Sequence, residues 1–139
     1  MENTTNRRIG DKVQIDGSYQ YNAYYNGRAP QRFWHYAKID GALKALNVKS
    51  GEEVLDVGCG SGLVSYFIST VEGVNVTALD ANIEALTFAK NKFNTSNIKY
   101  INGLLDDVKL PSNSFNKVVF LEVIEHISLE QGKEVLRLL

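Results

Sequence analysis

Short apolar runs alternate with amphipathic stretches along most of the chain. Runs of four to six residues rich in Val, Ile and Leu predict buried strands, and they fall at 54–57, 74–79, 98–101 and 117–121. Apolar residues at three- and four-residue steps predict helices, and they fall at 30–47, 63–71 and 82–93. Strands separated by helix-length connections indicate a parallel, doubly wound α/β sheet.

Residues at the ends of the predicted helices support their boundaries. Pro30 suits a first helical turn, Asn82 suits an N-cap, and Ser128 with Gln131 forms a capping box that predicts a final helix. Helices 30–47 and 82–93 are each expected to bury one apolar stripe. The stripes are Phe33, Tyr36, Ile39, Leu43 and Leu46 in the first helix, and Ile83, Leu86, Ala89 and Phe93 in the second.

A turn with almost no side chains follows the first predicted strand, and an acid follows the second. Gly58, Gly60 and Gly62 let the backbone approach a ligand closely and take conformations barred to other residues. The carboxylate of Asp80 can accept two hydrogen bonds from a ribose diol. Because the carboxyl ends of parallel strands meet at one edge of a sheet, we expect a nucleoside-bearing cofactor to bind there.

The spacing of the glycines narrows the choice of cofactor. A dinucleotide fingerprint, G-x-G-x-x-G, would need its third glycine at position 63, which is Leu63 here. Asp56 comes just before the turn, where a carboxylate is awkward beside a pyrophosphate but well placed for an ammonium group. An NAD(P)-dependent oxidoreductase is therefore the less favoured alternative.

At these residues the sequence resembles the class I S-adenosylmethionine-dependent methyltransferases, whose first motif is (V/I)LDxGxGxG. The resemblance implies that the loop holds the methionine end of S-adenosyl-L-methionine, that Asp56 bonds its amino group, directly or through neighbouring backbone, and that Asp80 holds its ribose. The structural alternatives are that Asp56 ties down the loop amides and that Asp80 caps the next helix. The matching residues are Val54, Leu55, Asp56, Gly58, Gly60 and Gly62.

The segment 101–111 is similar to the family's GDxEDLxLP-like segment. In many members an acid follows its glycine and accepts a hydrogen bond from the adenine amine, but here Leu104 follows Gly103. Either Asp106 substitutes for that acid, or backbone amides and apolar packing hold the base. The resemblance thus implies this cofactor-binding set: Asp56, Gly58, Cys59, Gly60, Asp80, Ala81, Leu104, Leu105, Asp106, Leu121 and Glu122.

Glu122, Glu125 and His126 share one face if the chain turns helical after the fourth predicted strand. Two carboxylates and an imidazole can ligate a divalent metal ion, and the pattern resembles a metal site of small-RNA 2′-O-methyltransferases and ubiquinone-pathway O-methyltransferases. Similar segments recur in family members that use no metal, so both alternatives stay open. His126 is separately a candidate general base, because imidazole titrates in the useful range.

Half of the chain's aromatic side chains fall within residues 18–36. They could form a lid over the cofactor, since aromatic faces attract sulfonium cations, or a helix packed across the end of the sheet. Packing is favoured for the cluster as a whole. One or two of Tyr19, Tyr21 and Tyr25 are expected to touch the cofactor pocket, and Tyr21 and Tyr25 are the candidates chosen. His35 beside Trp34 is expected to be structural.

Composition places the chain among ordinary globular proteins, with 44% apolar and 22% charged residues. Its formal charge of −1 gives no strong signal for nucleic acid or an acidic membrane. The single cysteine, Cys59, excludes an internal disulfide. No apolar run approaches the ~20 residues that span a bilayer. We therefore expect a cytoplasmic protein.

We expect a polar and aromatic N-terminal extension at 1–29 and an incomplete methyltransferase domain at 30–139. The fold class is α/β and Rossmann-like, with only the N-terminal four strands of the family's seven-stranded sheet. We predict a fragment of a longer protein or a shortened product with impaired activity, and an uncovered fourth strand would invite self-association. The predicted function is methyl transfer to a small-molecule acceptor. The alternative is a non-catalytic remnant that binds a cofactor or a partner.

Overall fold

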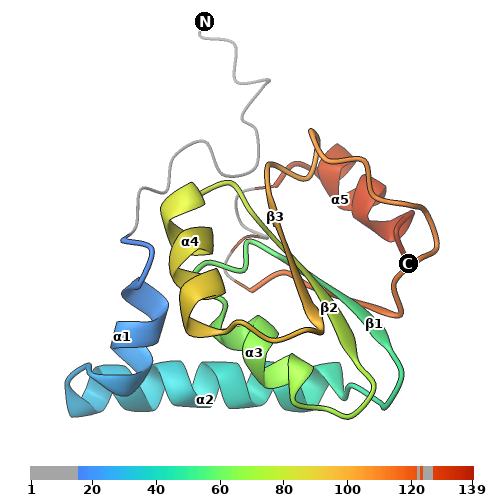
Figure 1. Ribbon diagram of the computed structural model, residues 1–139. Helices are drawn as coiled ribbons and strands as arrows, with labels where there is room; N and C mark the ends of the chain where they lie inside the picture. The colour runs from blue at the N-terminus through green and yellow to red at the C-terminus, as the bar shows by residue number, and fades with distance from the viewer. Residues whose placement is uncertain (1–15, 122, 124–126) are drawn as a thin grey trace, which may run out of the picture.

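The computed structural model of the chain describes residues 16–121, 123 and 127–139 (Figure 1). Strands and helices alternate from residue 53 onward, as the apolar pattern predicted, and two helices precede them. In chain order the elements are α1 (Tyr19–Tyr25), α2 (Ala29–Leu46), β1 (Glu53–Val57), α3 (Leu63–Ser69), β2 (Asn75–Asp80), α4 (Ile83–Lys92), β3 (Ile98–Asn102), β4 (Lys117–Val119) and α5 (Leu129–Leu136).

The strands form one parallel sheet in the order β3-β2-β1-β4. The predicted doubly wound, Rossmann-like α/β class is confirmed. Successive strands step outward from β1 to β3, and the chain then returns to the other side of β1 with β4. The order therefore reverses between β1 and β4, beside the carboxyl end of β1, and ligands of open α/β sheets bind at such switch points. β4 is shorter than predicted, since it ends at Val119 rather than at residue 121.

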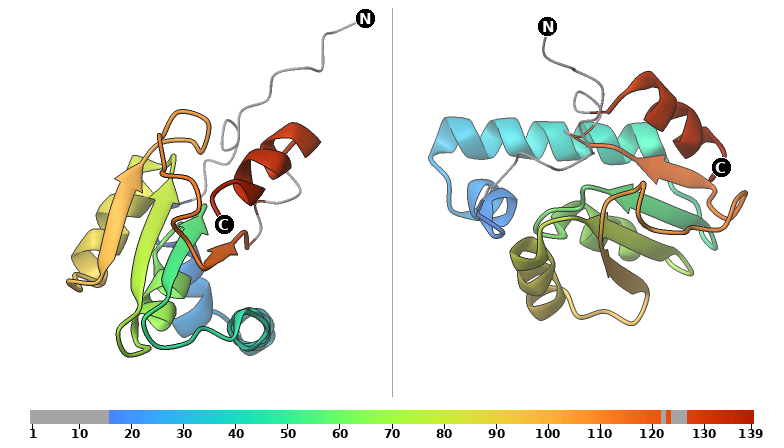
Figure 2. Two further views of the ribbon diagram at one scale, coloured as in Figure 1. Left: turned by 90° about the vertical axis from the view of Figure 1, so that its right-hand side faces the viewer. Right: turned by 90° about the horizontal axis from the view of Figure 1, so that it is seen from above.

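Both faces of the sheet are covered, and successive strand residues supply two separate cores. Val54 of β1 packs in the core shared with α2, α3 and α4, whereas Leu55 packs in the core shared with α5 and the segment 103–116. This follows from the alternation of side chains along a strand. Figure 2 shows the strands lying between α4 on one side and α5 on the other.

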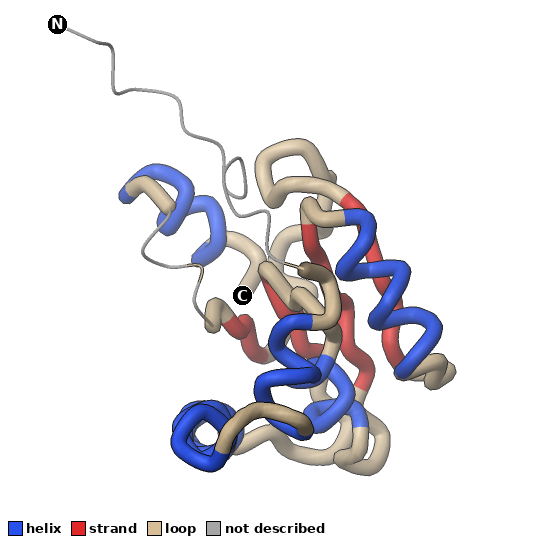
Figure 3. The backbone as a smooth tube through the Cα atoms, turned by 90° about the vertical axis from the view of Figure 1, so that its left-hand side faces the viewer, coloured by secondary structure: helices blue, strands red, loops and turns tan. Residues whose placement is uncertain are grey.

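The long helix α2 buries only the second half of the predicted stripe. Ile39 lies in the first core and Leu43 and Leu46 pack against it, but Phe33 is 74% exposed and Tyr36 is 55% exposed. In the first half of the helix the buried residue is His35 instead. The reason is that the first half of α2 runs past the sheet (Figure 1) and packs on α1, which lies beside α2 in the end-on view of Figure 3. There the ring of Tyr19 meets that of His35 at 5.9 Å.

Helix α4 begins as predicted. The side chain of Asn82 accepts hydrogen bonds from the amides of Glu84 and Ala85, which satisfies two otherwise unpaired donors of the first turn. Leu86, Ala89 and Phe93 are buried in line with the prediction, but Ile83 is 56% exposed. The first turn is anchored through Ala85 and Leu86 instead.

Within the described part of the chain, none of the helices is both long enough and apolar enough to cross a membrane.

Candidate functional site: a glycine loop facing an acid

The loop between β1 and α3 has the shape that its glycines allow. Gly58, Gly60 and Gly62 have φ values of +74°, +53° and +76°, in the left-handed region that favours glycine. A Cβ at Gly58 would overlap Val123, and one at Gly60 would lie 2.8 Å from Oε1 of Gln20. Side chains from α1 and from the segment after β4 therefore lie directly against the glycine backbone of the loop.

The loop is tied to the carboxyl end of β2. The amides of Gly58 and Cys59 both donate to the carbonyl of Leu79, at 2.7 and 3.1 Å. The amide of Gly60 donates to Oδ2 of Asp80 at 2.7 Å. The sequence placed the glycines and the acid at one edge of the sheet, and the structure brings them into direct contact.

The Asp80 carboxylate has capacity left for a ligand. Its Oδ1 accepts a hydrogen bond from the amide of Asn82 at 2.8 Å, and its Oδ2 accepts the bond from Gly60. Each carboxylate oxygen has two acceptor sites, so one site on each oxygen remains beyond these two bonds. The carboxylate both holds the loop and could take a diol.

Asp56 lies beneath the loop rather than on its surface. It is only 2% exposed, and the hydroxyl of Ser65 on α3 donates to its Oδ2 at 2.6 Å. The pKa of Asp56 is raised to about 6, mainly because the group is buried; the Ser65 hydrogen bond lowers this pKa, and the nearby Asp80 carboxylate adds to the rise. Burial therefore disfavours the charged carboxylate of Asp56, and the hydrogen bond from Ser65 offsets part of this cost.

Several other predicted cofactor residues contribute backbone or packing. Cys59 is 2% exposed in the core beneath α3, and burial raises the pKa of its thiol well above the ordinary value, which fits a filler rather than a nucleophile. Leu105 is buried in the second core, with Leu104 packed at its edge. Asp106 and Ala81 are exposed.

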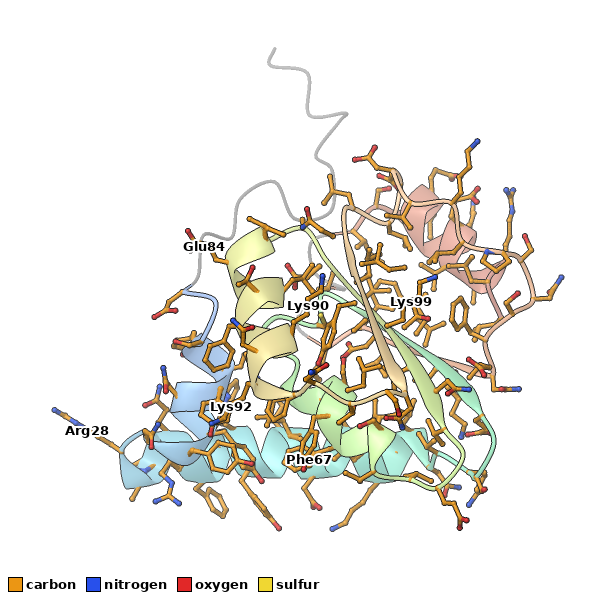
Figure 4. The ribbon with its side chains drawn as sticks, in the orientation of Figure 1. Arg28, Phe67, Glu84, Lys90, Lys92 and Lys99 are labelled. Atoms are coloured by element: carbon orange, nitrogen blue, oxygen red, sulfur yellow. The ribbon has the colours of Figure 1, made fainter. Side chains whose placement is uncertain are left out.

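The aromatic residues of α1 form a cluster with α2, α3 and α4. The ring of Tyr21 lies 4.7 Å from that of Tyr25 and 5.5 Å from that of Phe88. Nζ of Lys92 lies 4.8 Å from the Tyr21 ring, and Phe67 of α3 borders the same cluster (Figure 4). These contacts show packing, and the role of Tyr21 and Tyr25 in cofactor binding stays a prediction.

Sequence reasoning missed four residues around the loop. Gln20 covers Gly60, and Ser65 donates a hydrogen bond to Asp56. The side-chain amide of Asn102 donates to the carbonyls of Asp80 and Ala81. The buried hydroxyl of Ser61 has no hydrogen-bond partner among the described residues. The one signal in the sequence was a polar residue, Ser65, among the apolar residues of the predicted helix 63–71. The sequence does not indicate the hydrogen-bond partner of Ser65.

Glu122, Glu125 and His126, the candidate metal ligands, lie outside the described residues. Across residues 16–121, 123 and 127–139, no group of three or more His, Cys, Asp or Glu side chains could hold a metal ion. Leu121, the last predicted cofactor residue before them, is half-buried and packs against the first core.

A parallel sheet whose glycine loop faces an acid at the carboxyl ends of neighbouring strands is an arrangement typical of nucleoside-binding α/β domains. Residues 54–139 match the family model described as "Methyltransferase domain", and the chain belongs to that family, the class I S-adenosylmethionine-dependent methyltransferase domains. The prediction made from the residues between Val54 and Gly62 is confirmed. The match favours it over the nicotinamide-dependent alternative.

Three proteins illustrate the similarity. The chain is 35% identical over 99 residues to the mitochondrial ubiquinone biosynthesis O-methyltransferase of Schizosaccharomyces pombe, a match covering 68% of this chain and 35% of that protein. It is 33% identical over 118 residues to the sterol 24-C-methyltransferase of Pneumocystis carinii, covering 81% and 30%. A solved SAM-dependent methyltransferase from Aquifex aeolicus has a TM-score of 0.64 at 24% identity, covering 90% and 68%, which shows the shared fold. The chain spans about a third of the length of these curated relatives.

Proposed function

We propose that this chain binds S-adenosyl-L-methionine at the carboxyl ends of β1 and β2, and that it serves methyl transfer to a small-molecule acceptor. The observation that carries the proposal is the contact between the Asp80 carboxylate and the glycine loop, at 2.7 Å. Ubiquinone biosynthesis and sterol methylation, named for the relatives, support a small organic acceptor.

The residues around the loop fit this cofactor. Asp80 offers two acceptor sites to a ribose diol, and the unpartnered Ser61 hydroxyl offers a donor and an acceptor. The Asp80 carboxylate is close enough to Asp56 to raise the pKa of Asp56. Two carboxylates beside one loop attract a cation and repel a pyrophosphate, which supports a ligand with ammonium and sulfonium groups over a dinucleotide.

When bound, S-adenosyl-L-methionine supplies an already activated methyl group on its sulfonium. The task left to the chain is to bind and orient. Asp80 would fix the ribose, and the negative charge of Asp56 would favour the cofactor's amino group. The methionine end would lie along the backbone at Gly58 and Gly60, where Val123 and Gln20 lie in this structure. His126 as general base, and a metal held by Glu122, Glu125 and His126, stay predictions.

The remaining expectations from the sequence are also part of the proposal. They are the boundary between residues 29 and 30, the cytoplasmic location and self-association through β4. A non-catalytic remnant that binds a cofactor or a partner stays the alternative.

Calorimetric titration of the chain with S-adenosylhomocysteine and, separately, with NADH tests the proposal. We expect binding of S-adenosylhomocysteine, weakened in Asp80→Ala by about 1–3 kcal/mol, and unchanged in Glu72→Ala. Glu72 is a suitable control because it is an exposed carboxylate in the turn between α3 and β2. Tight binding of NADH alone would refute the proposal, and binding of neither ligand would support the remnant.

A further inference from the structure

The glycine loop is held from two sides by different kinds of contact. On the β2 side, the amides of Gly58, Cys59 and Gly60 donate to the last residues of that strand. On the α3 side, the described side-chain bond is the one between Ser65 and Asp56. Asp56 lies two residues before Gly58, and Ser65 lies three residues after Gly62. This single bond therefore closes the base of the loop.

The Ser65–Asp56 bond is fully removed from water. Ser65 is 0% exposed and Asp56 is 2% exposed, and the oxygens are 2.6 Å apart. A hydroxyl that donates to a buried carboxylate favours its charged form, and the bond also fixes the first turn of α3 against β1. Replacing Ser65 would therefore alter both the protonation of Asp56 and the position of the loop relative to β1 and α3.

We propose that Ser65 is a positioning residue of the cofactor site, whose buried hydrogen bond to Asp56 sets the glycine loop in its binding conformation. This inference rests on the proposed function, since it concerns how S-adenosyl-L-methionine or its product is held. Ser65 acts through Asp56 and does not itself touch the ligand.

The electrostatic surroundings of Asp56 make the role measurable. Among the described residues, the titratable groups that act on it or on which it acts are Asp80 from β2, Cys59 from the loop and Tyr100 from β3. All three are neutral or negative near neutral pH, and burial raises the pKa of both Cys59 and Tyr100. The hydrogen bond from Ser65 is thus the described contact that lowers the pKa of Asp56, whereas burial and Asp80 raise it.

The experiment measures affinity for S-adenosylhomocysteine between pH 5 and 8 by calorimetry, for the wild-type chain, Ser65→Ala and Ser69→Ala. The wild type should lose affinity about tenfold per pH unit below a midpoint near 6, as the carboxyl of Asp56 takes up its proton. In Ser65→Ala the midpoint should move to higher pH. Ser69→Ala should match the wild type, because Ser69 lies on the same helix and its hydroxyl donates to the carbonyl of Tyr66 instead.

A second measurement distinguishes a failure of the role of Ser65 from a failure of the proposed function. Carbon-13 NMR of the Asp56 carboxyl, in the ligand-free chain, should show the same upward shift of the midpoint in Ser65→Ala. If the NMR midpoint does not move, the effect of Ser65 on Asp56 is refuted. If it moves but affinity is unchanged at every pH, the positioning role is refuted while the proposed function stands. If the wild type fails to bind S-adenosylhomocysteine at any pH, the proposed function fails, and the cofactor role of Ser65 fails with it.

Discussion

Replacing Asp56 by Asn should stabilise the fold, and by an amount that depends on pH. The carboxyl is 2% exposed, and its pKa is raised from 3.8 to about 6, first because burial disfavours the charge. Between these two values the folded chain holds a proton that the unfolded chain has lost. Stability due to this group is therefore present below about pH 4 and declines as pH rises to about 6.

The size of the effect follows from the shift. Roughly two pKa units at about 1.36 kcal/mol each give about 3 kcal/mol of destabilisation at pH 8, relative to pH 4. Asn keeps the shape and can still accept from Ser65, but it carries no charge. A new amide donor left unpaired would cost the same free energy at every pH, so the difference between the two pH values isolates the charge.

The assay is urea unfolding of both proteins at pH 4 and pH 8. The free energy of unfolding of Asp56→Asn, minus that of the wild type, should be higher at pH 8 by about 3 kcal/mol. Other carboxylates titrate in both proteins and cancel. A difference that is the same at the two pH values would show that Asp56 carries no buried charge, and it would remove the electrostatic basis for the role given to Ser65.

Three further variants test the packing around the site. Gly62→Ala should lose about 2–4 kcal/mol by urea unfolding, because its Cβ would lie 2.7 Å from a side chain of α4; Gly51→Ala, at a similar φ but in open space, should lose only about 1–2 kcal/mol. Equal losses would contradict the close approach. Lys117→Met should lose about 1–3 kcal/mol by the same assay, since its ammonium donates to the last carbonyls of α2, and no loss would count against this cap. Ala45→Glu, in the apolar groove between α2 and β4, should reduce any self-association seen by analytical ultracentrifugation. Ala37→Glu, exposed on α2 outside that groove, is its control, and an equal effect of both would place the contact elsewhere.

The parts of the site that were predictable depend on short stretches of chain. Each strand was visible as an apolar run, and the turn after β1 could be recognised from its glycines. Asp80 could be placed opposite that turn because parallel neighbours bring their carboxyl ends together. The N-cap at Asn82 was equally local, since a cap bonds amides two and three residues away.

The parts that were not predictable depend on which surfaces meet. In the first half of α2 the inward side carries His35 because α1 packs there, whereas periodicity alone gave the side with Phe33 and Tyr36. Likewise, nothing local pairs Ser65 with Asp56, or places Gln20 over Gly60.

The sequence by itself thus determined the order of the strands and of the helices from α2 onward, the family and the two halves of the candidate site. These rest on apolar periodicity and on glycines and an acid at fixed spacing, whereas the helix α1 was not predicted. The tertiary structure decided that Asp56 lies beneath the loop, buried and bonded to Ser65, while Asp80 lies beside it with acceptor sites to spare. The physical reason is that the burial of a carboxyl group and its hydrogen-bond partners are set when separate helices and strands pack together. Both burial and hydrogen bonds determine whether the carboxyl group is charged.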